Sequence, residues 1–478
     1  MTEIRLEAGA APTIVLTGAG ERPREVALTG PRAQTRARVT GRGKTWRAVL
    51  PLQASRWGGP MLPLPSGDYE LVVEGAAVPA ASLPVTMLGP LRASVTDGIV
   101  RIGPAVDPAY ESWEGQAALE RRYANRPNVA LENAVFFESF YGRNVSDNPL
   151  AIDHELVRRA PNVTRYWSVV DLSIPVPDGA VPVVEGSPQW WRARGAARLL
   201  VVNDWLRRRF ERRGGQRVLQ TWHGTPLKRL ALHRGFDPRR MAAALRESGR
   251  WNVLLAQNPY SARVLRGAYG FRRRPIWIEG YPRNDVLVTG DDGRTRRMLG
   301  IGADERVLLY APTWRDDRDE MVDFLDAEAL ARDVDAVVLV RGHSRTLHPG
   351  RDTSGARVID VTGFGDTAQL MAASDALVTD YSSVMFDFTV TGRPIYFFTP
   401  DMGHYRDRLR DFYFDLTERA PGPLVATQAE LTRAIRSHDP AQWAQRYAAW
   451  RGVFNARDDG HAAERVVARL LDQGYVSR

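Results

Sequence analysis

The sequence predicts an α/β protein with two facing Rossmann-like domains and a smaller all-β domain in front of them. Two observations carry this prediction. Short apolar runs separated by Gly, Pro and Asp fill residues 1–120, whereas from residue 121 onward continuous apolar runs alternate with helical patterns. The chain of 478 residues is also too long for a single hydrophobic core. We therefore expect domains at 1–120, 121–290 and 291–478.

The first region is expected to be a sandwich-like accessory domain. Its apolar runs are short, show almost no helical periodicity and end in turn-forming residues. It contains no acid/base pair and no metal-ligand spacing, so an accessory or docking role is the best interpretation. The expected strands lie at 13–16, 25–28, 45–50, 69–73 and 99–102.

The two later regions are expected to hold parallel sheets that helices cover on both faces. Continuous apolar runs indicate strands buried on both sides, and helical stretches such as 261–266 and 367–373 lie between them. The runs are too many for one doubly wound sheet, so we divide them near 288–305, a polar stretch containing Gly and Asp. Two such domains facing across a central cleft form the GT-B architecture. The expected strands lie at 134–137, 164–170, 197–202, 218–222, 251–256 and 276–278, and then at 307–310, 336–340, 358–361, 376–378 and 395–398.

Composition and charge exclude several function classes. The chain has no cysteine, which rules out disulfides, thiolate nucleophiles and cysteine metal sites. No apolar run reaches the roughly 20 residues of a membrane span and no secretory signal is visible, so we expect a cytoplasmic protein. The net charge of +9 suits anionic partners, but charge without a recognisable module does not indicate nucleic-acid binding. Arginines cluster at 207–209, 212–213 and 217, either as a contact for anionic lipid or as a solvated helix face.

Polar side chains follow four of the expected strands, at the sheet edge where open α/β proteins bind ligands. The segments are 223–226 (HGTP), 311–315 (APTWR), 341–344 (RGHS) and 379–383 (TDYSS). Any one of them can be a strand end that meets solvent. Four together, each with His, Arg, Ser or Asp, predict one polar cleft.

The segment 379–383 is the candidate phosphate-binding element. Ser382 or Ser383 can cap the helix expected from Val384, whose free amides favour an anion. Simple N-capping accounts for one of the two serines. Asp387, one turn further on, is open to two interpretations: an acceptor for a substrate hydroxyl, or a buried partner for an arginine.

Two histidines follow strands in glycine-containing turns, His223 and His343. Histidine is the natural general base for an alcohol near neutral pH. Gly224 gives a substrate close access to His223, which makes His223 the candidate base, with a purely structural histidine as the alternative. For His343, beside Arg341, binding of donor phosphates is the better interpretation. Arg315 and Arg341 can clamp phosphate oxygens and stabilise the charge on a departing leaving group.

We expect no dedicated metal site and no cofactor. The sequence has neither an HExxH motif nor a Walker A lysine motif. Asp-x-Asp pairs occur at 317–319 and 333–335, but the first lies in a mixed-charge run and the second precedes its strand. Arginines, histidines and a helix terminus are therefore expected to take the place of Mg²⁺.

A series of short motifs runs through about 130–470, some 70% of the chain. The motifs are 137–140 (FESF), 146–149 (SDNP), 220–228 (QTWHGTPLK), 280–285 (GYPRND), 310–315 (YAPTWR), 341–343 (RGH), 380–383 (DYSS) and 421–423 (PGP). In type and order they resemble the CDP-glycerol glycerophosphotransferase family, the teichoic acid primases and polymerases. Residues 1 to about 120 lie outside the resemblance, and they read as strands where a helical membrane-targeting element is usual.

The resemblance implies a GT-B fold, CDP-glycerol as donor and peripheral attachment to the cytoplasmic face of the membrane. It implies that His223 acts on an acceptor hydroxyl, which then attacks the β-phosphorus and releases CMP. The acceptor is expected to be a lipid-linked glycan or a polyol phosphate. Candidate donor-binding residues are Thr313, Trp314, Arg315, Arg341, Asp380, Ser382, Ser383 and Asp387, and further substrate-site residues are Gly224, Thr225, Arg283, Asn284 and Asp285.

Other interpretations stay open at this point. The donor can be CDP-ribitol, or the chain can be a GT-B glycosyltransferase that uses a nucleotide sugar and releases a nucleoside diphosphate. A non-catalytic binding protein with a vestigial cleft is a third possibility, against which the intact His223, Arg341, His343 and Asp380 argue. Primase and polymerase activity are not distinguished, and neither is the oligomeric state.

Overall fold

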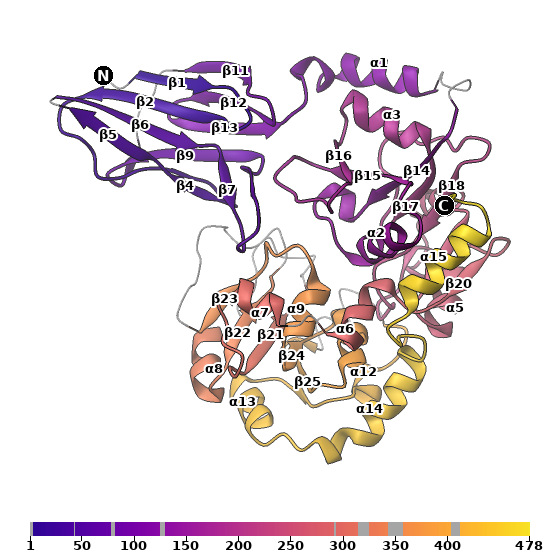
Figure 1. Cartoon of the computed structure of the whole chain (residues 1–478). Coiled ribbons are helices and arrows are strands. Elements are labelled where there is room, and N and C mark those ends of the chain that lie inside the picture. Colours follow the sequence, from indigo (N-terminus) through magenta and orange to yellow (C-terminus); the bar gives the residue numbers. More distant parts are fainter. Residues whose placement is uncertain are drawn as a thin grey trace.

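The computed structural model describes residues 3–42, 44–77, 82–124, 130–290, 293–313, 325–342, 357–402 and 412–478. Within these ranges the chain forms an all-β region and then two parallel sheets flanked by helices (Figure 1). This is the α/β, GT-B-like class that the apolar runs predict.

The all-β region consists of two antiparallel sheets around one core. Alternate residues of each strand face inward, as Trp46, Ala48 and Leu50 do, and Leu28 and Leu71 of the other sheet join the same core. The first sheet has the order β1 (Glu3–Glu7), β2 (Thr13–Ala19), β6 (Thr45–Pro51) and β5 (Arg38–Arg42). The second has the order β11 (Leu83–Met87), β12 (Leu91–Thr96), β13 (Ile99–Pro104), β9 (Gly67–Val73), β3 (Val26–Thr29) and β4 (Gln34–Arg36), with β10 (Ala76–Ala77) paired to β9.

A separate hairpin projects from this region. It is formed by β7 (Gln53–Ser55) and β8 (Met61–Pro63), which pair with each other alone. In Figure 1 it reaches from the β-region toward the second parallel sheet.

The first parallel sheet is buried on both faces, as its continuous apolar runs require. Ala134 and Phe136 enter the core on one side, whereas Val135 and Phe137 enter the core on the other. Its order is β16 (Val181–Val184), β15 (Thr164–Val169), β14 (Glu132–Glu138), β17 (Ala197–Val202), β18 (Arg217–Gln220), β19 (Val253–Ala256) and β20 (Ile276–Ile278). Its helices include α1 (Trp113–Ala124), α2 (Asp147–Arg159), α3 (Pro188–Ala196), α4 (Pro238–Ser248) and α5 (Pro259–Ala268).

The second parallel sheet is built in the same way. Leu309 lies in one core, and Leu308 and Tyr310 lie in the other. Its order is β23 (Val358–Asp360), β22 (Val337–Val340), β21 (Val307–Ala311), β24 (Ala376–Thr379), β25 (Ile395–Phe398) and β26 (Leu424–Val425). Its helices include α8 (Ala327–Val334), α9 (Thr367–Ala373), α10 (Val384–Phe388), α13 (Gln428–Arg436) and α14 (Pro440–Phe454).

The C-terminal helix α15 (Ala462–Asp472) returns to the first parallel sheet, where the yellow end of the chain lies in Figure 1. Its residues Val466, Val467 and Leu470 share a core with Val135 and Phe137. The sequence places 291–478 in one domain, whereas in the structure α15 completes the core of the domain before it. The apolar face of this helix predicts that it packs on a sheet, but the sequence pattern does not show which of the two sheets it covers.

Candidate active site

His223 lies in the turn that follows β18 (Arg217–Gln220). Its Nδ1 lies 2.6 Å from the backbone oxygen of Asn203, which follows β17. A carbonyl oxygen can only accept, so Nδ1 carries the proton and donates it. In a neutral imidazole the lone pair is then on Nε2, which is the atom that can take a proton from a substrate. The ring is also stacked on Trp222, with centroids 4.7 Å apart and planes 19° apart.

The backbone on both sides of His223 is held by the neighbouring motifs. Trp222 has a φ of 55°, in the left-handed region, and its N–H donates to Gln220 Oε1 at 2.9 Å. The side-chain amide of Asn148 donates to the carbonyl of Trp222 at 3.2 Å, and Arg283 Nη1 donates to the carbonyl of His223 at 3.0 Å. The side chains of two distant segments therefore fix the position of the imidazole.

Arg283 forms a buried ion network with two carboxylates from different parts of the chain. Its Nη1 pairs with Asp147 at the start of α2, and its Nη2 pairs with Asp387 Oδ2 in α10 at 2.7 Å. Burial lowers the pKa of Arg283, but the two carboxylates more than offset it, so that the pKa is raised overall. Burial raises the pKa of Asp387, against the opposing effect of Arg283.

Of the two interpretations of Asp387, the structure shows the arginine partner. Its second oxygen, Oδ1, accepts from Asn284 Nδ2 at 3.0 Å, so that both oxygens are engaged within the protein. Because Arg283 and Asn284 follow the first parallel sheet and Asp387 belongs to the second domain, the network joins the two halves.

Three further predicted substrate-site residues, Thr225, Asn284 and Asp285, hold the structure around the site through bonds to other protein groups. Thr225 is 1% exposed, and its hydroxyl donates to Gln257 Oε1 at 2.5 Å. Asn284 is fully buried between Asp387 and Asp458. Asp285 accepts from the backbone N–H groups of Ala462 and Ala463, which caps α15; burial raises its pKa against these two bonds.

Asp458 is a member of the buried network that the sequence analysis missed. It accepts from the backbone N–H of Tyr281 at 3.0 Å and from Gln257 Nε2 at 2.8 Å. Burial raises the pKa of Asp458 to about 6. An Asp in an Asp-Asp-Gly turn looks like ordinary loop chemistry in the sequence, so no signal there indicates its burial.

The His223 loop and the Ser382–Ser383 turn meet face to face. A Cβ atom added to Gly224 would lie 2.7 Å from Ser383 Oγ and 3.0 Å from Ser383 Cβ, so that Ser383 would have to move. Gly224 therefore makes room for the side chain of Ser383 against this loop. Ser383 stands at the N-cap position of α10 with helical φ and ψ, and its side chain makes no capping bond. Of the two serines considered as caps in the sequence, Ser383 therefore does not cap the helix through its side chain.

Asp380 ties together the ends of β21 and β24. Its Oδ1 accepts from the backbone N–H groups of Thr313 and Tyr381, at 2.8 and 2.5 Å. Asp380 is 2% exposed, so it shapes the turn that carries Ser382 and Ser383.

Arg341, at the end of β22, is held by the loop that follows β23. Its Nη1 donates to the carbonyls of Val361 at 3.2 Å and of Phe364 at 2.9 Å. Burial lowers the pKa of Arg341 to about 10, with Asp366 opposing. Three other predicted residues, Trp314, Arg315 and His343, lie outside the described residues.

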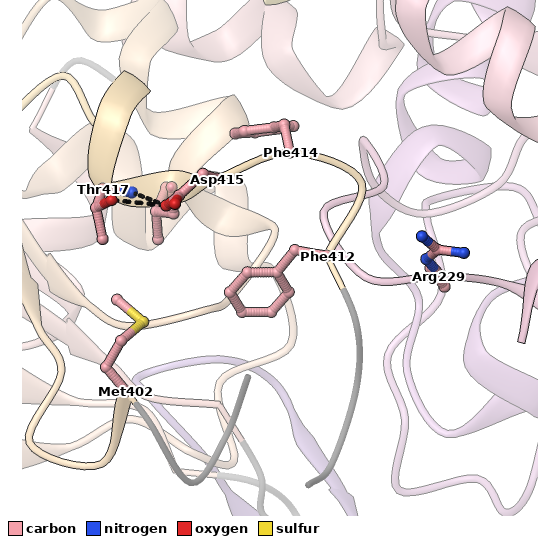
Figure 2. Close-up of a pocket in the computed structure, with 7 residues that line it drawn as sticks. Arg229, Met402, Phe412, Phe414, Asp415 and Thr417 are labelled. Atoms are coloured by element: carbon pink, nitrogen blue, oxygen red, sulfur yellow. Dashed lines mark hydrogen bonds between the residues drawn. The ribbon is translucent and has the colours of Figure 1, made fainter. Parts of the chain in front are cut away.

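A pocket of about 300 Å³ lies beside this site. Figure 2 shows the side chains of Met402, Phe412 and Phe414 on one wall and Arg229 on the segment that faces them. The pocket adjoins the site, because the ring of Phe412 lies 5.7 Å from that of Tyr381. Its lining combines a cation and a carboxylate, Arg229 and Asp415, with aromatic and thioether groups.

No group of three His, Asp or Glu side chains close enough to hold a metal ion occurs in the part of the chain that the structure describes. Of the two Asp-x-Asp pairs, 317–319 lies outside those residues. In the other, Asp335 pairs with Arg357 at 2.5 Å.

Comparison with known proteins decides the family. A family model described as CDP-Glycerol:Poly(glycerophosphate) glycerophosphotransferase matches residues 122–472. The chain belongs to this family. The resemblance drawn from the sequence motifs is thereby confirmed, and the site described above is that of a family member.

Relatives and solved structures agree with this assignment. The teichoic acid glycerol-phosphate transferase of Staphylococcus aureus (strain NCTC 8325 / PS 47) is 36% identical over 370 residues, which cover 71% of this chain and 93% of that protein. The teichoic acid ribitol-phosphate primase of Bacillus spizizenii (strain ATCC 23059 / NRRL B-14472 / W23) is 32% identical over 210 residues, 42% of this chain and 54% of that protein. The structure of the wall teichoic acid polymerase TagF superposes with a TM-score of 0.70 at 31% identity, covering 75% of this chain and 94% of that one. The family match begins at residue 122 and so leaves out the all-β region.

Proposed function

We propose that this member of the glycerophosphotransferase family transfers glycerol phosphate from CDP-glycerol to an acceptor hydroxyl, with release of CMP. The reaction belongs to the synthesis of teichoic acid or a related cell-surface polymer. The observation that carries the proposal is the hydrogen bond from His223 Nδ1 to the carbonyl of Asn203. Because Nδ1 holds the proton, Nε2 can accept one from a substrate. In this member of the family, His223 lies where the two domains meet. A glycerol rather than a ribitol donor is favoured, since the glycerol-phosphate relative matches 71% of the chain and the ribitol-phosphate relative 42%.

In the proposed reaction His223 Nε2 removes the proton of the acceptor hydroxyl. The acceptor oxygen then forms a bond to the β-phosphorus, which carries the glycerol. The bond from that phosphorus to the bridging oxygen breaks, and the electron pair leaves with CMP. The product is the acceptor extended by one glycerol phosphate, and the proton stays on His223 until it passes to water.

Donor recognition is assigned to the turns that face His223. Ser382 and Ser383 present hydroxyl and amide donors to the pyrophosphate, and Arg341 binds a phosphate oxygen of the donor. Asp380 and Thr313 shape this turn through their mutual hydrogen bond. Trp314, Arg315 and His343 keep the donor-binding role that the sequence predicts for them, and the pyrophosphate is bound without a metal.

Product analysis tests this proposal. Purified protein is incubated with CDP-glycerol, CDP-ribitol or nucleotide sugars and a lipid-linked disaccharide, with and without EDTA. We expect CMP release and acceptor extension with CDP-glycerol, at the same rate in EDTA. Release of a nucleoside diphosphate from a sugar donor would instead identify a glycosyltransferase, and absence of turnover with every donor would contradict the transferase proposal.

We also propose that the protein docks on the cytoplasmic face of the membrane through α4 and the turn before it. Phe236 is 88% exposed and Leu245 is 48% exposed. Arg239 and Arg246 are exposed two helical turns apart on the same helix, which suits anionic headgroups around an apolar contact. No helix of the described part of the chain is long and apolar enough to cross a membrane.

The side chains of the arginine cluster at 207–217 bond to other groups of the protein. It lies in a segment without helix, contrary to the helix face considered from the sequence. Arg207 and Arg208 both pair with Glu185, and Arg209 pairs with Glu211. The side chains of the other three donate to backbone carbonyls: Arg212 to Arg250, Arg213 to Gly195 and Arg217 to Gln216.

Replacing both Phe236 and Leu245 with serine is expected to weaken binding to phosphatidylglycerol-containing vesicles by about tenfold, because two apolar contacts are lost. Vesicle co-sedimentation measures the change. Val453→Ser, on α14 and 45% exposed, is the matched control and should bind as the wild type does. Equal binding by all three proteins would contradict this docking surface.

A further inference from the structure

The β7–β8 hairpin contacts the domain of the second parallel sheet. The ring of Trp57, at the tip, meets that of Phe364 edge-on, with centroids 5.8 Å apart and planes at 64°. Trp57 also packs against the hydrophobic core of that domain. Beside it, Arg56 Nη2 donates to the carbonyl of Gly363 at 3.4 Å, so close that a Cβ atom on Gly363 would lie 2.7 Å from Arg56 Nη2.

The loop that receives Trp57 is the loop that holds Arg341. The carbonyls of Val361 and Phe364 accept from Arg341 Nη1, and Thr362 Oγ1 accepts from the backbone N–H of Gly342 at 2.8 Å. Phe364 therefore contacts Trp57 through its ring and Arg341 through its carbonyl. Phe364 thereby links the β-region to the guanidinium of Arg341 in the proposed donor site.

The hairpin is anchored at its base as well. The backbone N–H of Ser66, just after β8, donates to Asp171 Oδ2 at 2.8 Å. Asp171 is 3% exposed and follows β15 of the first parallel sheet. Leu64 is buried in the core of the β-region itself. The segment thus contacts all three parts of the molecule, which a freely moving arm would not do.

We propose that Trp57 is a positioning residue for the donor site: it fixes the 361–364 loop and, through it, the Arg341 guanidinium that binds the donor pyrophosphate. This inference rests on the role proposed above for Arg341. An arginine held in place before binding loses less side-chain entropy when a phosphate binds, so the benefit is expected in donor affinity. The all-β region, which the family match leaves out, is then part of the working donor site.

Alanine at position 57 tests the proposal. We expect Trp57→Ala to raise both the KM and the Kd for CDP-glycerol by about tenfold while kcat changes less than about twofold, since the loss concerns preorganisation. Trp57→Phe keeps a ring against Phe364 and should stay within about twofold of wild type. Val85→Ala, at a 54% exposed site of the same β-region, is the matched control and should change nothing. Titration calorimetry and CMP release give the three constants.

A double-mutant comparison shows whether the effect passes through Arg341. In an Arg341→Ala background, Trp57→Ala should weaken CDP-glycerol binding by less than about twofold further. An equal loss in both backgrounds, or no loss in the wild-type background, would overturn the proposal. If Trp57→Ala does not fold, Arg56→Ala removes the bond to Gly363 while the Trp57 ring stays, and it should give about threefold weaker binding. A wild-type protein that does not bind CDP-glycerol would refute the proposed function instead, before any variant is compared.

Discussion

His223→Ala is expected to lower kcat for glycerol phosphate transfer by about 1,000-fold, the range in which a positioned general base contributes. The bond from Nδ1 to the carbonyl of Asn203 fixes which nitrogen accepts the proton, and alanine removes that nitrogen. Donor binding should change by less than about threefold, because His223 is expected to contact the acceptor hydroxyl and not the cytidine or its phosphates. Single-turnover CMP release measures kcat, and calorimetry measures the Kd for CDP-glycerol.

Two further measurements separate catalysis from structure. His461→Ala, at a side chain that is 67% exposed, is the matched histidine control and should retain full activity. Added imidazole should restore part of the activity of His223→Ala, since a small base can occupy the vacated space, whereas a structural defect would not respond. Wild-type turnover by His223→Ala, or a loss confined to donor affinity, would remove His223 from the role of base.

The sequence predicts the strands of the two parallel sheets wherever burial on both faces leaves a continuous apolar run. The runs at 197–202 and 395–398 coincide with β17 and β25. Two of the four edge strands, β16 and β26, escape this signal. β16 contains Pro182 and is exposed at its first two positions, and β26 has only two residues. Neither therefore shows an apolar run long enough to stand out.

The sequence predicts which strand ends carry the polar side chains of the candidate site. It does not predict the groups to which these side chains bond. His223 stood out because it follows a strand beside glycine. Its partner is a backbone carbonyl of Asn203, which leaves no mark in a sequence. Asp285 and Thr225 were also predicted to lie at the substrate site. In the structure Asp285 caps α15, and Thr225 bonds to Gln257. A motif shows that a side chain is needed, and only the fold shows whether it faces a substrate or a neighbour.

Arg283→Met is expected to lower the free energy of unfolding by about 3–5 kcal/mol, the usual consequence of removing one partner from a buried charge network. Methionine fills most of the volume of the arginine stem but leaves Asp147 and Asp387 buried without a cation. Chemical denaturation followed by circular dichroism measures the change. Arg101→Met breaks the Arg101–Asp68 ion pair, whose side chains are 72% and 54% exposed, and should leave stability almost unchanged.

The origin of this loss can be resolved by neutralising the carboxylates as well. Adding Asp147→Asn and Asp387→Asn to Arg283→Met removes both uncompensated charges, so the triple variant should recover about half of the lost stability. It should not recover activity, because Arg283 Nη1 also holds the carbonyl of His223 and no methionine can replace that bond. A triple variant as unstable as Arg283→Met would show that packing, not charge, maintains the junction. Recovered activity would show that the imidazole is positioned without Arg283, by Asn148 and the carbonyl of Asn203 alone.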